Sequence, residues 1–171
     1  PNTGRIVAKS TIKAYKGTLE VLRLLNKSST ITFSNINMNW YNRFVEWCYK
    51  KSLSTNTIGK HIKTLKTVLN VAVDKGVSNN VEFRHKNFKV LREDVESIYL
   101  NEKELKAMID LDLTKSPQLE NARDLFIIGA YTGLRVSDFN NLNKENIVIE
   151  RGVRMFKVFT TKTKKFIGVP I

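Results

Sequence analysis

The spacing of apolar residues changes once along this chain, and that change does most to limit the possible folds. Through residues 10–142 the apolar residues mostly recur at the three- and four-residue intervals of helices. After that they alternate, as in strands, over three short runs at 147–149, 155–161 and 166–171. The pattern predicts a mainly α-helical protein that ends in a small three-stranded antiparallel sheet.

Three helices are expected in the first part of the chain, at 10–26, 38–51 and about 55–74. The first has Ser10 or Thr11 as its cap, and the third has Ser54 or Thr55. The residues expected to face the core are Ile12, Tyr15, Leu19 and Leu22 in the first helix, Trp40, Phe44, Trp47 and Cys48 in the second, and Ile58, Ile62, Leu65, Leu69 and Ala72 in the third.

The opposite face of the third helix is basic and polar. Lysines alternate there with side chains that form hydrogen bonds, and no acid occurs between Ser52 and Val73. Lysines neutralise phosphates, while Asn and Thr reach base edges. A solvated helix face is the plain alternative, but such a face usually carries Glu–Lys pairs. The pattern favours DNA binding through Asn56, Thr57, Lys60, Lys63, Thr64 and Thr67.

The overall charge supports a polyanionic partner. The chain has 29 lysines and arginines against 16 acids, a net charge of +13. Residues 1–95 carry a net +11 (17 against 6), and residues 96–171 only +2 (12 against 10). Such asymmetry indicates one unit that binds a polyanion, either nucleic acid or an anionic membrane surface, and a second unit with another task.

Other classes of protein are disfavoured. No apolar run approaches the roughly 20 residues of a membrane span. Cys48 is the only cysteine, which excludes an internal disulfide and a cysteine-based zinc site. We therefore expect a cytoplasmic protein without metal or cofactor.

A polar, basic stretch over 77–99 reads as a linker, and a second unit follows it. Asn101 and Glu104 form a capping box for a helix that ends near residue 110. A helix that starts with Pro117 at its first position runs to Gly133, and a short helix follows to about residue 142. Arg135 then lies in the first turn of that short helix, where the helix dipole disfavours a cation. A guanidinium there suits a phosphate site that Asp138 supports; a surface pair between these two residues is the plain alternative.

Several motifs together resemble the tyrosine recombinases, the phage integrase family. The segment Thr132–Asp138 resembles the family's signature around its first catalytic arginine, and Thr161–Lys165 followed by Val169–Ile171 resembles its lysine hairpin and next strand. Leu53–Lys60 and Leu100–Leu105 resemble helix openings of its two domains. The resemblance covers nearly the whole chain and is closest to integrases of phages and conjugative elements.

The resemblance implies an architecture and roles. It implies a helical SAM-like core-binding domain at 7–85, a basic linker at 86–96, and the first part of a mixed α+β catalytic domain at 97–171. Arg135 would bind the scissile phosphate, Lys162 would protonate the leaving 5′ hydroxyl, and Asp138 would support the site. Lys164 and Lys165 would contact phosphates or replace Lys162. The partners would be double-stranded DNA and, in the synaptic complex, three further copies of the enzyme, and the reaction would pass through a 3′-phosphotyrosyl link without metal.

The sequence departs from the family in one important respect. The family also has a His-X-X-Arg motif and a tyrosine nucleophile after the lysine hairpin. Neither His61 nor His85 is followed by an arginine three residues later, and the last tyrosine is Tyr131. We therefore expect an N-terminal fragment that binds DNA but does not cleave it. A helical DNA-binding regulator without enzymatic activity is the alternative, and it would need neither Arg135 nor Lys162.

Overall fold

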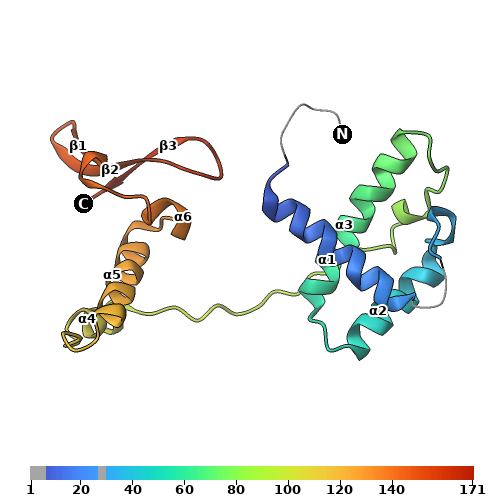
Figure 1. Ribbon diagram of the computed structural model, residues 1–171, viewed down its shortest axis with the longest axis horizontal. Coiled ribbons are helices and arrows are strands. Elements are labelled where there is room, and N and C mark those ends of the chain that lie inside the picture. Colours follow the sequence, from blue (N-terminus) through green and yellow to red (C-terminus); the bar gives the residue numbers. More distant parts are fainter. Residues whose placement is uncertain (1–6, 27–29) are drawn as a thin grey trace. The chain divides into compact units, whose positions relative to one another are not determined.

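The computed structural model describes residues 7–26 and 30–171, and the chain divides into two compact units, Pro1–Glu96 and Ser97–Ile171 (Figure 1). Within the described ranges, no helix has both the length and the apolar character needed to cross a membrane.

The first unit contains the three predicted helices, α1 (Lys9–Leu25), α2 (Met38–Lys50) and α3 (Thr55–Asp74), and two short 3-10 helices at Phe33–Asn35 and Glu82–Arg84. Their bounds agree with the prediction to within one residue. The buried core is apolar and mostly aromatic or branched: Ile36, Trp40, Tyr41, Phe44, Cys48, Ile58, Ile62, Leu65, Leu69, Phe83 and Phe88. Burial raises the pKa of the Cys48 thiol to about 11, so this cysteine is an unreactive core residue at neutral pH.

The predicted cap and core face of α1 are wrong. Ala8 precedes the helix and makes no side-chain cap, whereas Ser10 and Thr11 lie inside its first turn. The predicted core residues Ile12, Tyr15 and Leu19 are exposed, and only Leu22 is partly buried. Thr18 is the buried residue of α1, and Val21, Leu22 and Leu25 pack beside the core. The helix is therefore rotated relative to its most apolar stripe.

Helices α2 and α3 agree closely with the sequence. Asn37 caps α2 by accepting the Trp40 N–H at 2.9 Å, and Ser54 caps α3 by accepting the Thr57 N–H. Trp40, Phe44 and Cys48 are buried and Trp47 is partly buried, as predicted. All five residues of the predicted apolar stripe of α3 are also buried.

The segment Glu82–Glu93, which we call the strap, packs antiparallel along α3. Arg84 bonds to Asn70 near the C-terminal end of the helix. Further along, the Lys66 ammonium donates to the Phe88 carbonyl at 2.9 Å. The strap ends at the N-terminal end of α3, where the Asn56 side chain bonds to both the N–H and the C=O of Glu93.

The strap corrects our description of residues 86–91 as linker. Phe83 and Phe88 are completely or almost completely buried, and Leu91 packs beside the same core. Two aromatic anchors in a polar sequence hold this segment in the first unit, although no periodicity marks them. Residues 92–100 are exposed and lack regular secondary structure.

The helices of the second unit are α4 (Glu102–Ile109), α5 (Pro117–Thr132) and α6 (Val136–Phe139). The Asn101–Glu104 capping box forms as predicted: each residue's side chain accepts the other's backbone N–H. Pro117 is the first residue of α5, and Gly133 ends that helix in the left-handed region with φ 63°. Figure 1 shows α5 leading directly into α6 below the sheet.

A three-stranded antiparallel sheet completes the second unit, with strands β1 (Ile147–Glu150), β2 (Val153–Phe159) and β3 (Phe166–Pro170) in the order β1-β2-β3. The fold class is therefore confirmed. Successive residues of β2, and Thr160 directly after it, point to opposite faces of the sheet. Val158 and Thr160 are buried on one face, whereas Lys157 and Phe159 are exposed on the other.

Candidate phosphate site and nucleic-acid interface

The turn between α5 and α6 presents Arg135 to solvent. After Gly133, the buried Leu134 anchors the turn, and Arg135 follows with extended backbone (φ −70°, ψ 151°). Arg135 is the N-cap of α6, one position earlier than the predicted first turn. Its carbonyl accepts the N–H groups of Asp138 and Phe139, which fixes the backbone of this residue. The side chain is 52% exposed and can reach a ligand.

Asp138 joins the Arg135 turn to the β2–β3 hairpin. Its carboxylate is almost fully buried; Oδ1 accepts the Thr161 backbone N–H at 2.8 Å and the Ser137 hydroxyl at 3.3 Å. Oδ2 accepts no hydrogen bond and lies 3.8 Å from a terminal nitrogen (Nη1) of Arg135. The hydrogen bond from Thr161 is the main cause that lowers the pKa of Asp138, so the group is ionised at neutral pH.

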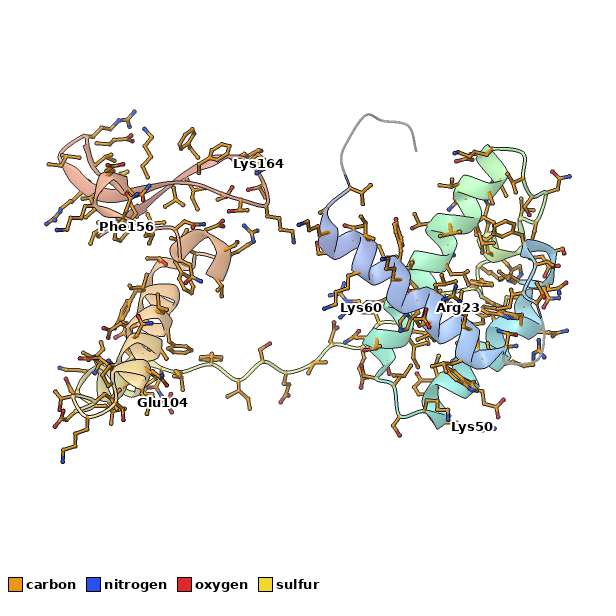
Figure 2. All side chains as sticks on the ribbon, in the orientation of Figure 1. Arg23, Lys50, Lys60, Glu104, Phe156 and Lys164 are labelled. Atoms are coloured by element: carbon orange, nitrogen blue, oxygen red, sulfur yellow. The ribbon has the colours of Figure 1, made fainter. Side chains whose placement is uncertain are left out.

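The hairpin turn that carries the candidate lysines is organised by Thr160. This buried residue donates its N–H to the Lys165 carbonyl at 2.9 Å, and its hydroxyl contacts Thr163 and both the N–H and C=O of Lys165. Lys162, Lys164 and Lys165 are all exposed. Figure 2 shows Lys164 at the end of this hairpin, where its backbone has a φ of 54°.

The arrangement favours an anion. Lys162 directly follows Thr161, whose backbone N–H donates to the Asp138 carboxylate. The same buried carboxylate pairs with Arg135. In the described ranges the three exposed turn lysines form no ion pair. Across those same residues, no group of three or more histidines, cysteines and acids could hold a metal ion. Exposed guanidinium and ammonium groups are suited to phosphate oxygens.

The exposed face of α3 is the second basic surface. Lys60, Lys63 and Thr67 are exposed there, and Figure 2 shows Lys60 on this helix. Thr64 is partly buried because the start of α1 packs beside it; a shallow groove lies between the two helices, lined by Ser10, Thr11, Ala14, Tyr15, Lys63, Thr64 and Thr67.

Three of the predicted DNA-contacting side chains make bonds within the protein. Asn56 holds Glu93 of the strap, the Thr57 hydroxyl contacts Ser54, and the Thr67 hydroxyl donates to the Lys63 carbonyl. Their DNA contacts stay predictions, and Asn56 has a structural role that the sequence did not indicate. Lys60 and Lys63 make no such bond in the described part of the chain and are free to contact a ligand.

Two residues that shape these surfaces were not predicted from the sequence. Thr18 contacts Nδ1 of His61 at 3.0 Å and thereby ties α1 to α3 beside Lys60. Thr160 organises the lysine turn from a buried position. A polar residue inside an otherwise apolar face is the only signal that could have indicated either one, and it does not identify the bonding partner.

Comparison with known proteins gives the family. The model of the phage integrase SAM-like domain matches residues 2–90, just over half of the chain. A comparison with curated proteins gives no match.

Two solved structures share the fold of the chain. One is lambda integrase, solved as a tetramer bound to a Holliday junction (TM-score 0.74, 17% identity, covering 97% of this chain and 44% of that one). The other is the integrase of the Tn1549 transposon in complex with a circular intermediate DNA (TM-score 0.70, 16% identity, 99% of this chain and 57% of that one). The chain thus spans about half the length of each structure. From the domain match and the shared fold, the chain belongs to the tyrosine recombinase, or phage integrase, family.

Proposed function

We propose that this chain is the DNA-binding part, and the first half of the catalytic site, of a site-specific DNA recombinase. The single observation that carries the proposal is the buried Asp138 carboxylate. It pairs with Arg135 and accepts the backbone N–H next to Lys162, so two separate motifs of the family are joined in one folded unit. A DNA-binding regulator without enzymatic activity would not need Asp138 to connect Arg135 with the lysine turn.

The chemistry assigned to each residue follows from its charge and position. The Arg135 guanidinium would bind two nonbridging oxygens of the scissile phosphate and stabilise the charge that develops in the transition state. Lys162 would donate its proton to the 5′ oxygen as the bond from that oxygen to phosphorus breaks. Asp138, whose carboxylate is buried, would orient the arginine and the lysine turn without contacting the phosphate. Lys164 and Lys165 would contact neighbouring phosphates.

The nucleophile is not supplied by the residues described above. The five tyrosines lie at 15, 41, 49, 99 and 131, and the sequence contains no His-X-X-Arg. We expect the 171-residue chain to bind duplex DNA without cleaving it. In the complete enzyme, a tyrosine would form the 3′-phosphotyrosyl link, and four protomers would assemble on two DNA sites.

The first unit would grip the duplex through α3. Lys60 and Lys63 lie on one exposed face of that helix, and the strap adds the exposed side chains of Lys86, Lys89 and Arg92. Because these charges are exposed, their contribution to binding would be screened by salt. The protein would therefore bind any duplex at low salt and require its target sequence at higher salt.

The test is a series of fluorescence anisotropy titrations of the 171-residue chain with a short duplex at increasing salt. If Lys60, Lys63, Arg135, Lys162, Lys164 and Lys165 each neutralise one phosphate, the slope of log K against log salt is about −5, and each strap cation that also contacts a phosphate makes it steeper by about 0.9. The variant Lys60→Ala/Lys63→Ala should reduce that slope by about 2. The matched control is Lys50→Ala, because Lys50 is paired with Glu46 on α2. Absence of binding at low salt would refute the proposal.

A further inference from the structure

Two phenylalanines lie directly opposite each other at the end of the β2–β3 ladder and are exposed. Phe159 and Phe166 form the last pair before the lysine turn. Their side chains are 50% and 67% exposed, and their ring centroids are 5.0 Å apart at an angle of 57°. The tilted packing leaves ring surface open to solvent.

The pair lies on the outer face of the sheet. Strand alternation turns Val158 and Thr160 towards the core and Phe159 away from it. On the same outer face, Met155 covers Gly168, and Lys157, two residues before Phe159, is paired with Glu150 at the end of β1. The open aromatic surface is therefore confined to the end of the hairpin that carries the lysines.

The charge around the pair identifies the kind of partner. From residue 151 to residue 171 the chain holds six lysines and arginines and no acid. Three of these cations, Lys162, Lys164 and Lys165, lie in the turn that connects the two phenylalanine positions. An apolar protein segment would gain nothing from this charge, whereas a nucleic acid combines anionic phosphates with bases that stack on aromatic rings.

We propose that the Phe159–Phe166 pair is a stacking platform for a nucleobase that has left the duplex stack next to the bound phosphate. This inference rests on the proposed function and adds a contact to it. The turn lysines would hold the backbone on either side, and the exposed ring of Phe166 would receive the base. Apolar side chains that enter DNA between base steps also unstack bases, in proteins that kink the duplex. The site would therefore favour DNA that is locally unpaired or easily unstacked.

The experiment compares two short duplexes of one sequence, one fully paired and one with a single unpaired adenine, in anisotropy titrations with the 171-residue chain at low salt. The chain should bind the second duplex about tenfold tighter, which is within the range for one base stacked on an aromatic ring. Phe166→Leu and Phe159→Leu should remove this preference and leave affinity for the paired duplex within about twofold. Leucine keeps the apolar contact across the strands, so both variants should fold, which circular dichroism checks.

The matched control is Phe126→Leu, a change at an exposed phenylalanine of α5 that should leave the preference intact. Binding to both duplexes with equal affinity, or a preference that survives both hairpin variants, would overturn the platform but leave the proposed function standing. Failure to bind either duplex would instead overturn the proposed function. A dimer that both hairpin variants dissociate, seen by sedimentation, would show that the pair receives a second copy of the chain and would also overturn the platform.

Discussion

Gly59→Ala tests whether the strap packs along α3 as described, because the backbone of the strap approaches the helix closely at this glycine. A Cβ atom at position 59 would lie only 1.9 Å from the carbonyl oxygen of Leu91. That oxygen belongs to backbone and cannot rotate away. The strap would have to move, although Phe88 is buried on one side of the clash and Asn56 holds Glu93 on the other.

The magnitude follows from two opposing contributions. Alanine is a better helix former than glycine by about 1 kcal/mol. Overpacking against neighbours that cannot move costs about 1–3 kcal/mol. The cost should lie at the upper end of this range because the strap is held on both sides of the clash. The net loss in the free energy of unfolding should be about 2 kcal/mol. Gly17→Ala is the matched control: position 17 also lies within a helix of this unit, and a Cβ there meets nothing within 4 Å, so it should gain up to about 1 kcal/mol.

Urea denaturation followed by tryptophan fluorescence measures both variants. The chain has two tryptophans, Trp40 and Trp47, and both lie in α2, so the signal reports on the first unit. With a slope of about 2 kcal/mol per molar urea, Gly59→Ala should lower the midpoint by about 1 M and Gly17→Ala should raise it slightly. A Gly59→Ala protein as stable as the parent would refute the described course of the strap.

Two further predictions concern single residues. Lys164 adopts a φ of 54°, a conformation that costs free energy for any residue with a side chain. Lys164→Gly should therefore keep or raise the thermal stability of the second unit, while it weakens DNA binding several-fold. An unchanged affinity would show that Lys164 does not contact DNA. Burial, with a smaller effect of Lys60, lowers the pKa of His61 below its ordinary value of 6.5, so the unfolded chain takes up a proton that the folded chain does not. The free energy of unfolding of the first unit should therefore fall as pH drops below about 6.5, and urea titrations should show a weaker fall for His61→Gln; identical pH profiles would contradict this.

Apolar spacing predicted burial well in α3 and poorly in α1. The apolar stripe of α3 was correct at every position because that helix crosses the middle of the core, where spacing alone decides burial. The orientation of α1 was wrong because Thr18, a polar residue, faces α3. Its hydroxyl donates to the Ala14 carbonyl, so its contact with His61 requires a hydrogen on Nδ1, and no helical periodicity encodes such a bond.

Long-range backbone contacts account for the remaining differences. Phe83 and Phe88 are isolated in a polar segment, so nothing local indicated that they anchor the strap. In the second unit, the motif around Arg135 and the lysine turn were both found in the sequence, but Thr161 comes 26 positions after Arg135. Their connection through Asp138 depends on one backbone N–H, which every residue other than proline can supply.

An NMR titration of the 171-residue chain with a short DNA duplex tests whether Arg135 and Lys162 bind the same phosphate. It would follow the Arg135 side-chain Nε–H and the Lys162 backbone N–H. If Arg135 and Lys162 bind one phosphate and Asp138 holds them together, both signals shift along a single binding curve. The variant Asp138→Ala should then remove the Lys162 shift. Two different curves, or a Lys162 shift that Asp138→Ala leaves unchanged, would contradict the account.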